Sequence, residues 1–103
     1  MVAHLWARTS ATSCTINEPN IVARFGYEEA IFAPGRRDRD ARLRATDNFI
    51  AAHRGAVDVV KSALPETKVG LTWAMSDYQA QPGGEDRLVE MRSLSEDVYL
   101  EAA

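Results

Sequence analysis

Apolar and polar residues alternate along two short stretches of the chain, and each stretch predicts a β-strand. The first runs from Cys14 to Ile16. The second is KVGLTWAM at 68–75, in which Val69, Leu71 and Trp73 fall on one face. Because successive side chains of a strand point to opposite faces, the small residues between these three lie on the other face. We therefore expect two strands, one in each half of the chain.

A one-sided apolar pattern between the two strands predicts a long amphipathic helix. Its apolar residues recur largely at intervals of seven, and they are Leu43, Phe49, Ile50, Val57, Val60 and Leu64. Such spacing places them along one side of a helix, where they can pack against a sheet. We expect the helix to begin near Asp38 and to end at Pro65, because proline does not continue a helix.

Shorter helices and loops account for the remainder of the pattern. Residues 2–7 match the tail of a helix, IVARF at 21–25 predicts a short helix, and GYEEAIFAPG at 26–35 predicts an ordered loop. SDYQAQPGG at 76–84 is a second loop, and a further helix begins at Glu85. The resulting order is helix, strand, helix, strand, helix. This order favours parallel strands joined by right-handed crossovers, and hence an α/β fold.

The stretch TINEPN at 15–20 carries the polar residues of greatest interest. Asn17 and Glu18 stand where the first strand ends and a helix begins, which is where enzymes built on parallel sheets hold their catalytic groups. The residue before a proline is pushed out of the α region, so we expect an extended backbone at Glu18 and a helix starting at Pro19. Strict alternation would send Asn17 and Glu18 to opposite faces, so both can reach one substrate only if the pleat breaks here.

Composition and charge narrow the classes of function. With 103 residues, 46% hydrophobic residues and a net charge of -3, the chain has the composition of one globular domain. Acidic residues outnumber basic ones, 15 to 12, so we expect neither nucleic acid nor an anionic membrane surface as a partner. The basic run RRDRDARLR at 36–44 contains two aspartates and predicts a solvated helix start. No stretch approaches the roughly 18 consecutive apolar residues of a membrane span.

A single cysteine limits the chemistry further. Cys14 has no second cysteine to pair with and no nearby histidine at metal-ligand spacing, so we expect no disulfide and no metal site. A reducing, cytoplasmic setting fits this usage. We expect Cys14 to be a small buried apolar residue, and His4 and His53 to be surface or helix-packing residues.

Two parallel strands alone make a poor domain, because a parallel sheet normally has several strands and both faces covered. The apolar residues on the strand at 68–75 therefore imply neighbours that this chain does not supply. We expect residues 1–103 to be a slice of a larger α/β protein, which cannot close by itself.

Four landmarks, in order and in register, are similar to those of glycoside hydrolase family 1, the β-glucosidase family. They are TINEP at 15–19 for T-x-N-E-P, GYEEAIFAPG at 26–35 for G-Y-x-x-G-x-x-x-P-G, AHRGAV at 52–57 for A-H-x-x-A-V, and KVGL at 68–71. DYQAQPGGE and LSEDVYLEAA resemble the bacterial branch of the family. Three positions depart from the family pattern, where Ser13 replaces a tryptophan, Ala30 the loop glycine and Asp47 a histidine.

The resemblance implies a (β/α)8 barrel of which this chain holds about a quarter. TINEP would end the fourth strand, the long helix would be the fourth crossover, and KVGL would be the fifth strand. Residues 1–103 would then be a fragment of a single glycoside hydrolase barrel domain, comprising about two βα units. Its implied partners are a β-glycoside sugar and the missing remainder of the barrel.

The resemblance also implies a retaining hydrolase that acts by double displacement and needs neither metal nor cofactor. Such enzymes use two carboxyl groups about 5 to 5.5 Å apart. Glu18 matches the general acid/base, and Asn17 matches the asparagine that binds the 2-hydroxyl of the sugar. The family's nucleophile lies in a T/S-E-N-G motif that does not occur in this chain, and Glu28 and Glu29 lie too close in sequence to Glu18 to replace it. We therefore expect the chain alone to be inactive.

The sequence leaves several alternatives open. The substrate of the parent enzyme could be a β-glucoside, a phospho-β-glucoside or a β-galactoside, because the pockets that discriminate these sugars lie outside the chain. A non-catalytic, truncated α/β module that survives by binding a partner is an alternative from another class. Trp73 fits core packing or sugar stacking, and Tyr78 fits the exit side of a sugar site.

Overall fold

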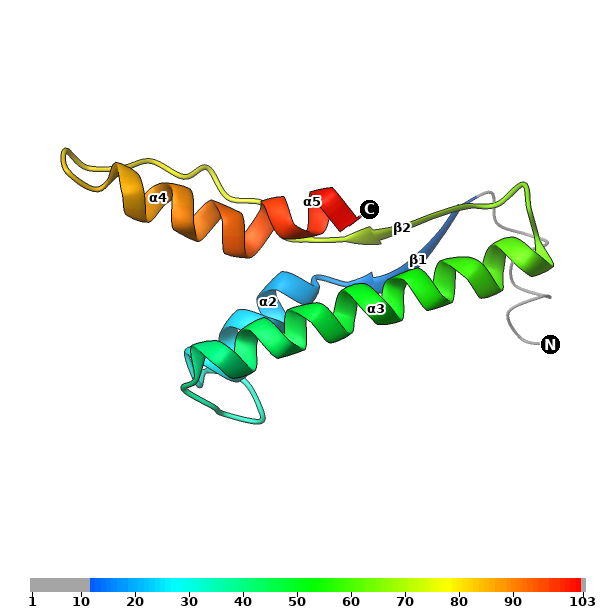
Figure 1. Ribbon diagram of the computed structural model, residues 1–103, viewed down its shortest axis with the longest axis horizontal. Helices are drawn as coiled ribbons and strands as arrows, with labels where there is room; N and C mark the ends of the chain where they lie inside the picture. Colours follow the sequence, from blue (N-terminus) through cyan, green and yellow to red (C-terminus); the bar gives the residue numbers. More distant parts are fainter. Residues whose placement is uncertain (1–11, 103) are drawn as a thin grey trace.

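The computed structural model describes residues 12–102, so the helix tail expected at residues 2–7 lies outside the described part (Figure 1). Two strands, β1 and β2, are each followed by helical segments. In chain order the elements are β1 (Thr12–Asn17), α2 (Pro19–Ala23), the π-helix η1 (Arg24–Glu28), α3 (Arg39–Ala63), β2 (Lys68–Thr72), α4 (Glu85–Arg92), the π-helix η2 (Ser93–Asp97) and α5 (Val98–Ala102).

The two strands are parallel neighbours, as the order of elements predicts. Cys14 pairs with Gly70, and Asn17 pairs with Thr72. Three steps along β1 therefore match two steps along β2, so β1 holds one extra residue near its carboxyl end. Such a bulge bends a strand and re-aims the side chains that follow it.

Helix α3 has the predicted bounds because strong signals stand at both of its ends. The side chain of Asp38 caps the helix by accepting hydrogen bonds from the backbone N–H groups of Asp40 (3.0 Å) and Ala41 (3.3 Å). The helix ends at Ala63, before Pro65. It runs alongside both strands and forms the crossover between them (Figure 1).

The buried face of α3 differs from the predicted apolar stripe. The buried residues are Ala41, Arg42, Ala45, Thr46 and His53. Leu43 is 40% exposed, and the rest of the stripe is only half-buried. The difference arises because the described neighbours of α3 present polar groups, so polar residues of the helix are the ones that find partners. His53, for example, is hydrogen-bonded through Nδ1 to the hydroxyl of Thr15 on β1 (2.7 Å).

The first helical segment is longer than the helix predicted over 21–25. It begins at Pro19 and continues from α2 into η1, which contains Gly26, so the predicted loop starts only after Glu28. Gly26 is buried, and a Cβ there would lie 2.9 Å from the carbonyl oxygen of Ala33. The close approach of the returning loop therefore requires glycine at this position.

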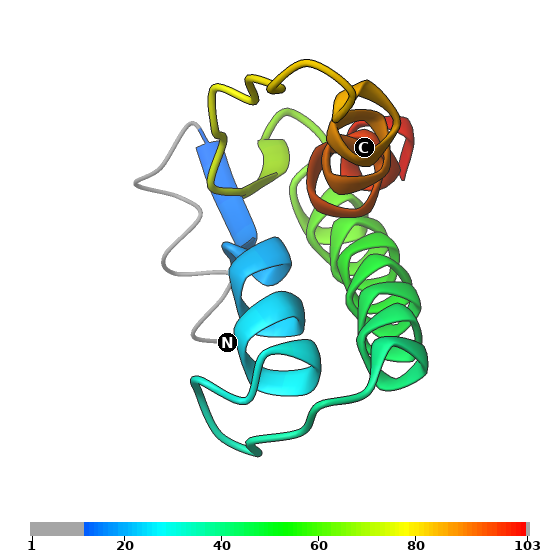
Figure 2. The same cartoon turned by 90° about the vertical axis from the view of Figure 1, so that its left-hand side faces the viewer.

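The second half of the chain follows the predicted order with a shorter strand. β2 ends at Thr72, three residues before the predicted end, and residues 73–84 form the connection to α4. From Glu85 the helical segments α4, η2 and α5 follow one another without a break. Figure 2 shows α3 and the α4 to α5 run on the same side of the two strands.

The described residues bury few large apolar side chains. The buried apolar residues are Ala23, Ala41, Ala45 and Tyr99, whereas the buried polar ones are Asn20, Arg42, Thr46, His53, Thr67, Ser95 and Glu96. The radius of gyration is 16.1 Å, compared with about 13 Å for a compact domain of 100 residues. These properties are those of an open piece of a sheet with helices on one side.

Candidate active site

Glu18 and Asn17 lie at the carboxyl edge of the sheet, beside the end of β2. The backbone N–H of Glu18 donates to the carbonyl oxygen of Thr72 (2.8 Å). The carbonyl oxygen of Glu18 accepts from the N–H groups of Ile21 (3.1 Å) and Val22 (3.3 Å) in α2. The backbone of Glu18 is therefore held from both sides, by the strand next to it and by the helix after it.

The backbone of Glu18 is left-handed, with φ 47° and ψ 55°, and the predicted extended conformation was wrong. Pro19 disfavours the right-handed α region at the preceding residue. The left-handed region lets the chain leave β1 and enter α2 while the N–H still reaches β2. A residue with a side chain adopts this conformation at a cost of about 1 to 2 kcal/mol.

Asn17 is joined to β2 through its side chain. Its Oδ1 accepts a hydrogen bond from the hydroxyl of Thr72 (2.8 Å), and the residue is exposed. The bulge in β1 and the left-handed backbone of Glu18 together break the pleat at this point. The break that the sequence requires for Asn17 and Glu18 to serve one substrate is therefore present.

The Glu18 side chain is half-buried and has no hydrogen bond or ion pair with the described residues. In contrast, Glu29 accepts two hydrogen bonds from Arg24 (3.0 and 3.2 Å), and Glu28 pairs with Arg39 and Arg42. Glu28 and Glu29 thus both pair with arginines, unlike Glu18.

The cluster around Glu28 corrects the expectation of a solvated basic run at 36–44. Arg42 is only 1% exposed; its guanidinium donates to Glu28 and to the hydroxyl of Ser95 (3.2 Å). Burial raises the pKa of Glu28, but the hydrogen bonds from Arg42 and Arg39 outweigh it and leave that pKa below its ordinary value. Hydrogen bonds to Glu28 and Glu90 raise the pKa of Arg39. The helix start is therefore partly a buried ion cluster.

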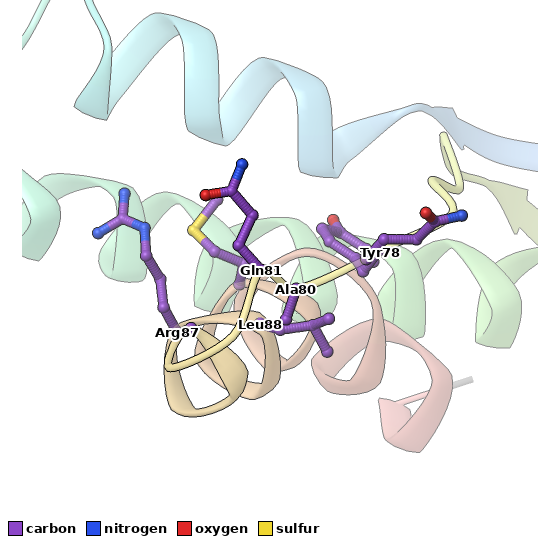
Figure 3. Close-up of a pocket in the computed structure, with 8 residues that line it drawn as sticks. Tyr78, Ala80, Gln81, Arg87 and Leu88 are labelled. Carbon is purple, nitrogen blue, oxygen red and sulfur yellow. The ribbon is translucent and has the colours of Figure 1, made fainter.

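Trp73 and Tyr78 lie beyond the end of β2. Trp73 is half-buried, and its indole Nε1 is buried without a hydrogen-bond partner among residues 12–102. Tyr78 lines a cavity of about 320 Å³ between the 76–84 loop and α4 (Figure 3). The guanidinium of Arg92 lies 5.8 Å from the centre of the Tyr78 ring. Neither Asn17 nor Glu18 lines this cavity.

Sequence reasoning missed two buried polar residues near the strand ends and misplaced one thiol. Asn20 and Glu96 are 3% and 6% exposed, and each bonds the backbone that follows β2. The position of Asn20, in the first turn of a helix that directly follows a strand, was the signal in the sequence that could have identified it. Cys14 is exposed, not buried as predicted, because the described residues provide no layer over its side of β1. His53 packs inside, as expected of a helix-packing residue.

No group of histidine, cysteine, aspartate and glutamate side chains among residues 12–102 has the arrangement of a metal site. No helix in the same range has the length and apolar content needed to cross a membrane.

Comparison with known proteins places the chain in a family. The model of glycosyl hydrolase family 1 matches residues 6–102. The chain is 37% identical to the β-glucosidase A of Thermotoga maritima over 59 residues, which are 57% of this chain and 13% of that protein. It is 37% identical to the β-galactosidase of Saccharolobus solfataricus over 79 residues, which are 75% of this chain and 16% of that protein.

A 1,4-β-D-glucan glucohydrolase of Thermotoga neapolitana is 30% identical over 59 residues, 57% of this chain and 14% of that protein. No solved structure matches at a significant level. The chain thus spans only 13% to 16% of the length of these relatives. Because the family model covers nearly the whole chain, the chain belongs to glycosyl hydrolase family 1.

Proposed function

We propose that residues 1–103 are part of the single (β/α)8 barrel domain of a retaining β-glucosidase-like enzyme, with β1 and β2 as its fourth and fifth strands. Three observations support this proposal. The two strands are parallel neighbours, α3 connects them as a crossover, and the chain spans a small share of each relative. Active sites of such barrels lie at the carboxyl ends of the strands, where Asn17 and Glu18 stand.

Glu18 is the proposed general acid/base, and Asn17 is the proposed ligand of the sugar's 2-hydroxyl. The observation that carries this assignment is the backbone of Glu18, which is bonded to both β2 and α2 while its side chain has no partner among the described residues. A rigid backbone with a free carboxyl group suits a residue that must deliver a proton to a defined point.

The proposed reaction has two steps. In the first, a carboxylate from outside this chain attacks the anomeric carbon, the glycosidic C–O bond breaks, and the protonated Glu18 gives its proton to the departing oxygen. In the second, the ionised Glu18 takes a proton from water, whose oxygen attacks the anomeric carbon and releases the sugar from the carboxylate. Hydrogen bonds to the 2-hydroxyl strengthen in the transition state, which is the role of Asn17.

A β-galactoside is the second candidate substrate, alongside a β-glucoside. The observation that favours it is the match to the β-galactosidase of Saccharolobus solfataricus, which covers more of this chain than the match to β-glucosidase A. The two candidates are distinguished by the rates at which a barrel that contains this chain hydrolyses a β-glucoside and the β-galactoside with the same aglycone.

The role of Glu18 is tested in a completed barrel, in which this whole chain replaces the matching segment of Thermotoga maritima β-glucosidase A. Because general acid catalysis contributes about 10² to 10⁴ in rate, Glu18→Gln should lower hydrolysis of methyl β-glucoside by that factor and affect dinitrophenyl β-glucoside far less. Glu66→Gln, an exposed glutamate just before β2, is the control and should change neither rate. Equal losses on both substrates, or an inactive completed barrel, would contradict the proposal.

The isolated chain should not turn over an aryl β-glucoside, because the proposed nucleophile lies outside it. Turnover by a pure sample of the 103 residues would refute this expectation. The buried polar contacts between η1, α3 and η2 favour one alternative, a non-catalytic module that binds a partner. That alternative requires a monomeric, soluble chain with a cooperative thermal transition, whereas a slice with open strand edges should self-associate.

A further inference from the structure

The backbone that follows β2 continues past the point where it loses its strand partner. β1 ends at Asn17 and the chain turns into α2, so the last backbone bond between the strands is the one from Glu18 to Thr72. Polar backbone groups that leave a ladder in a buried place need new partners. Two buried side chains supply them.

The side-chain amide of Asn20 replaces the missing strand at Ala74. Its Nδ2 donates to the carbonyl oxygen of Ala74 (2.6 Å), and its Oδ1 accepts from the N–H of the same residue (3.2 Å). An amide side chain thereby makes the pair of bonds that a backbone peptide would make. Asn20 itself is only 3% exposed, and leaving a buried polar group unpaired costs about 1 to 3 kcal/mol.

Glu96 continues the same pattern two residues further on. Its Oε1 accepts from the N–H of Ser76 (2.9 Å), and the residue is 6% exposed. The attached residues are therefore Thr72, Ala74 and Ser76, at every second position. In an extended backbone these positions turn their N–H and C=O groups to the same side. The segment after β2 is held as a strand would be, first by α2 and then by η2.

We propose that Asn20 is a positioning residue for Glu18, an inference that rests on the proposed function. Glu18 is attached to Thr72 through its own N–H, and the next attachment is the amide of Asn20, with only Pro19 between them. Two attachments on either side of Pro19, whose φ is fixed by its ring, leave the Glu18 backbone little freedom. Asn20 therefore keeps the strained backbone of Glu18 at the rim of β2. A displacement of 1 Å in a catalytic group can cost about 10²-fold in rate.

The test compares Asn20→Ala with Glu18→Gln in the completed barrel. Asn20→Ala should lower the rate of hydrolysis of methyl β-glucoside at least about tenfold more than that of dinitrophenyl β-glucoside. The reason is that a poor leaving group such as methanol depends on protonation by a correctly placed general acid, whereas dinitrophenolate departs without it. Asn48→Ala, an exposed asparagine of α3, is the matched control and should leave the ratio of the two rates unchanged. If Asn20→Ala lowers both rates equally, Asn20 is merely structural and the inference is overturned.

A double variant separates this inference from the proposed function. In the Glu18→Gln background, the further change Asn20→Ala should leave the ratio of the two rates unaltered, because the residue through which Asn20 acts is already absent. If Glu18→Gln alone does not discriminate between the substrates, the proposed function fails. If Glu18→Gln discriminates and Asn20→Ala does not, only the positioning role fails.

Hydrogen exchange provides a readout that needs no activity. In Asn20→Ser, which keeps a small polar side chain and guards against loss of the fold, the amide hydrogens of both Ala74 and Glu18 should exchange faster than in the parent barrel. A purely local role for Asn20 would expose Ala74 alone, and unchanged protection at Glu18 would overturn the inference.

Discussion

At the scale of single residues, positive φ occurs at two described positions that carry a side chain, Glu18 at 47° and Ala30 at 57°. Glu18 is bonded to two elements, so its surroundings maintain the conformation, as is common for strained residues at functional sites. Ala30 follows η1 in the loop where the sequence resembles a family pattern with glycine. Ala30 has no role in the proposed reaction, so its strained backbone is not needed for catalysis.

Replacing Ala30 by glycine should stabilise the protein. The left-handed backbone costs an alanine about 1 to 2 kcal/mol, and the greater freedom of glycine in the unfolded chain offsets part of that gain. We expect Ala30→Gly to raise the free energy of unfolding of the completed barrel by about 0.5 to 1 kcal/mol, measured by urea denaturation. Gly55→Ala, at a helical position of α3 with open space around it, should also stabilise by up to about 1 kcal/mol. A lower free energy of unfolding for Ala30→Gly would contradict the claim that the left-handed backbone of Ala30 is strained.

At the scale of elements, a polar cluster centred on Glu28 joins η1, α3, α4 and η2. Glu28 of η1 pairs with Arg39 and Arg42 of α3. Arg39 also pairs with Glu90 of α4, and Arg42 bonds Ser95 of η2. Because Arg42 is buried, removal of its carboxylate partner leaves a charge that water cannot reach.

The variant Glu28→Gln should destabilise the fold in a pH-dependent manner. The folded pKa of Glu28 is lowered, so its stabilising effect is present above the unfolded pKa, about 4.3, and is lost as the pH falls through the folded pKa. We expect the completed barrel to lose about 2 to 3 kcal/mol at pH 7 in this variant, with the difference from the parent shrinking below about pH 4. Denaturant unfolding across this pH range is the measurement.

Glu29→Gln is the matched control for the Glu28 variant. Glu29 pairs with a single cation, Arg24, in a half-exposed position, and such pairs contribute less than about 1 kcal/mol. A pH-independent difference for Glu28→Gln, or an equal effect of Glu29→Gln, would be inconsistent with a buried ion cluster.

The bounds of α3 and the strand end at TINEPN could be predicted from the sequence, whereas the end of β2, the length of the first helical segment and the buried polar contacts could not. Asp38 and Pro65 bound α3 through local chemistry, and TINEPN marks a strand end for similar local reasons. The buried positions of Arg42 and Asn20 depend on partners more than fifty residues away in the chain, at Ser95 and Ala74. A polarity pattern assigns such residues to the surface. The left-handed backbone of Glu18 was likewise missed, because it depends on hydrogen bonds to both β2 and α2.

At the scale of the whole molecule, the described residues form an elongated body of 51 × 28 × 18 Å with large apolar side chains on its surface. Those exposed side chains are Val22, Ile31, Phe32, Leu43, Val59, Met75, Val89 and Leu100. Both helical runs lie on one side of the strands (Figure 2). The proposed barrel would cover the strand edges and part of this surface.

Cys14 reports on that covering. Its side chain is exposed in the chain by itself, so an aromatic disulfide reagent should react with it at the rate of a free cysteine. In the completed barrel, residues of the other strands should cover this face of β1 and slow the reaction at least about tenfold, because reactivity follows access to the thiol. Ser13→Cys combined with Cys14→Ser probes the neighbouring, half-buried position as a control. Equal rates for Cys14 in the chain and in the barrel would contradict the proposed location of β1 inside the sheet.

The extra residue in β1 has a consequence for any attempt to transplant this rim. Between Cys14 and Asn17 the strand advances by three residues while β2 advances by two. Deleting one residue there would make both strands advance by two and would remove the bulge that re-aims Asn17 and Glu18. A designer who moves this rim should therefore keep the irregular strand Thr12–Asn17 and the opposing Lys68–Thr72 together, along with the Asn20 contact to Ala74.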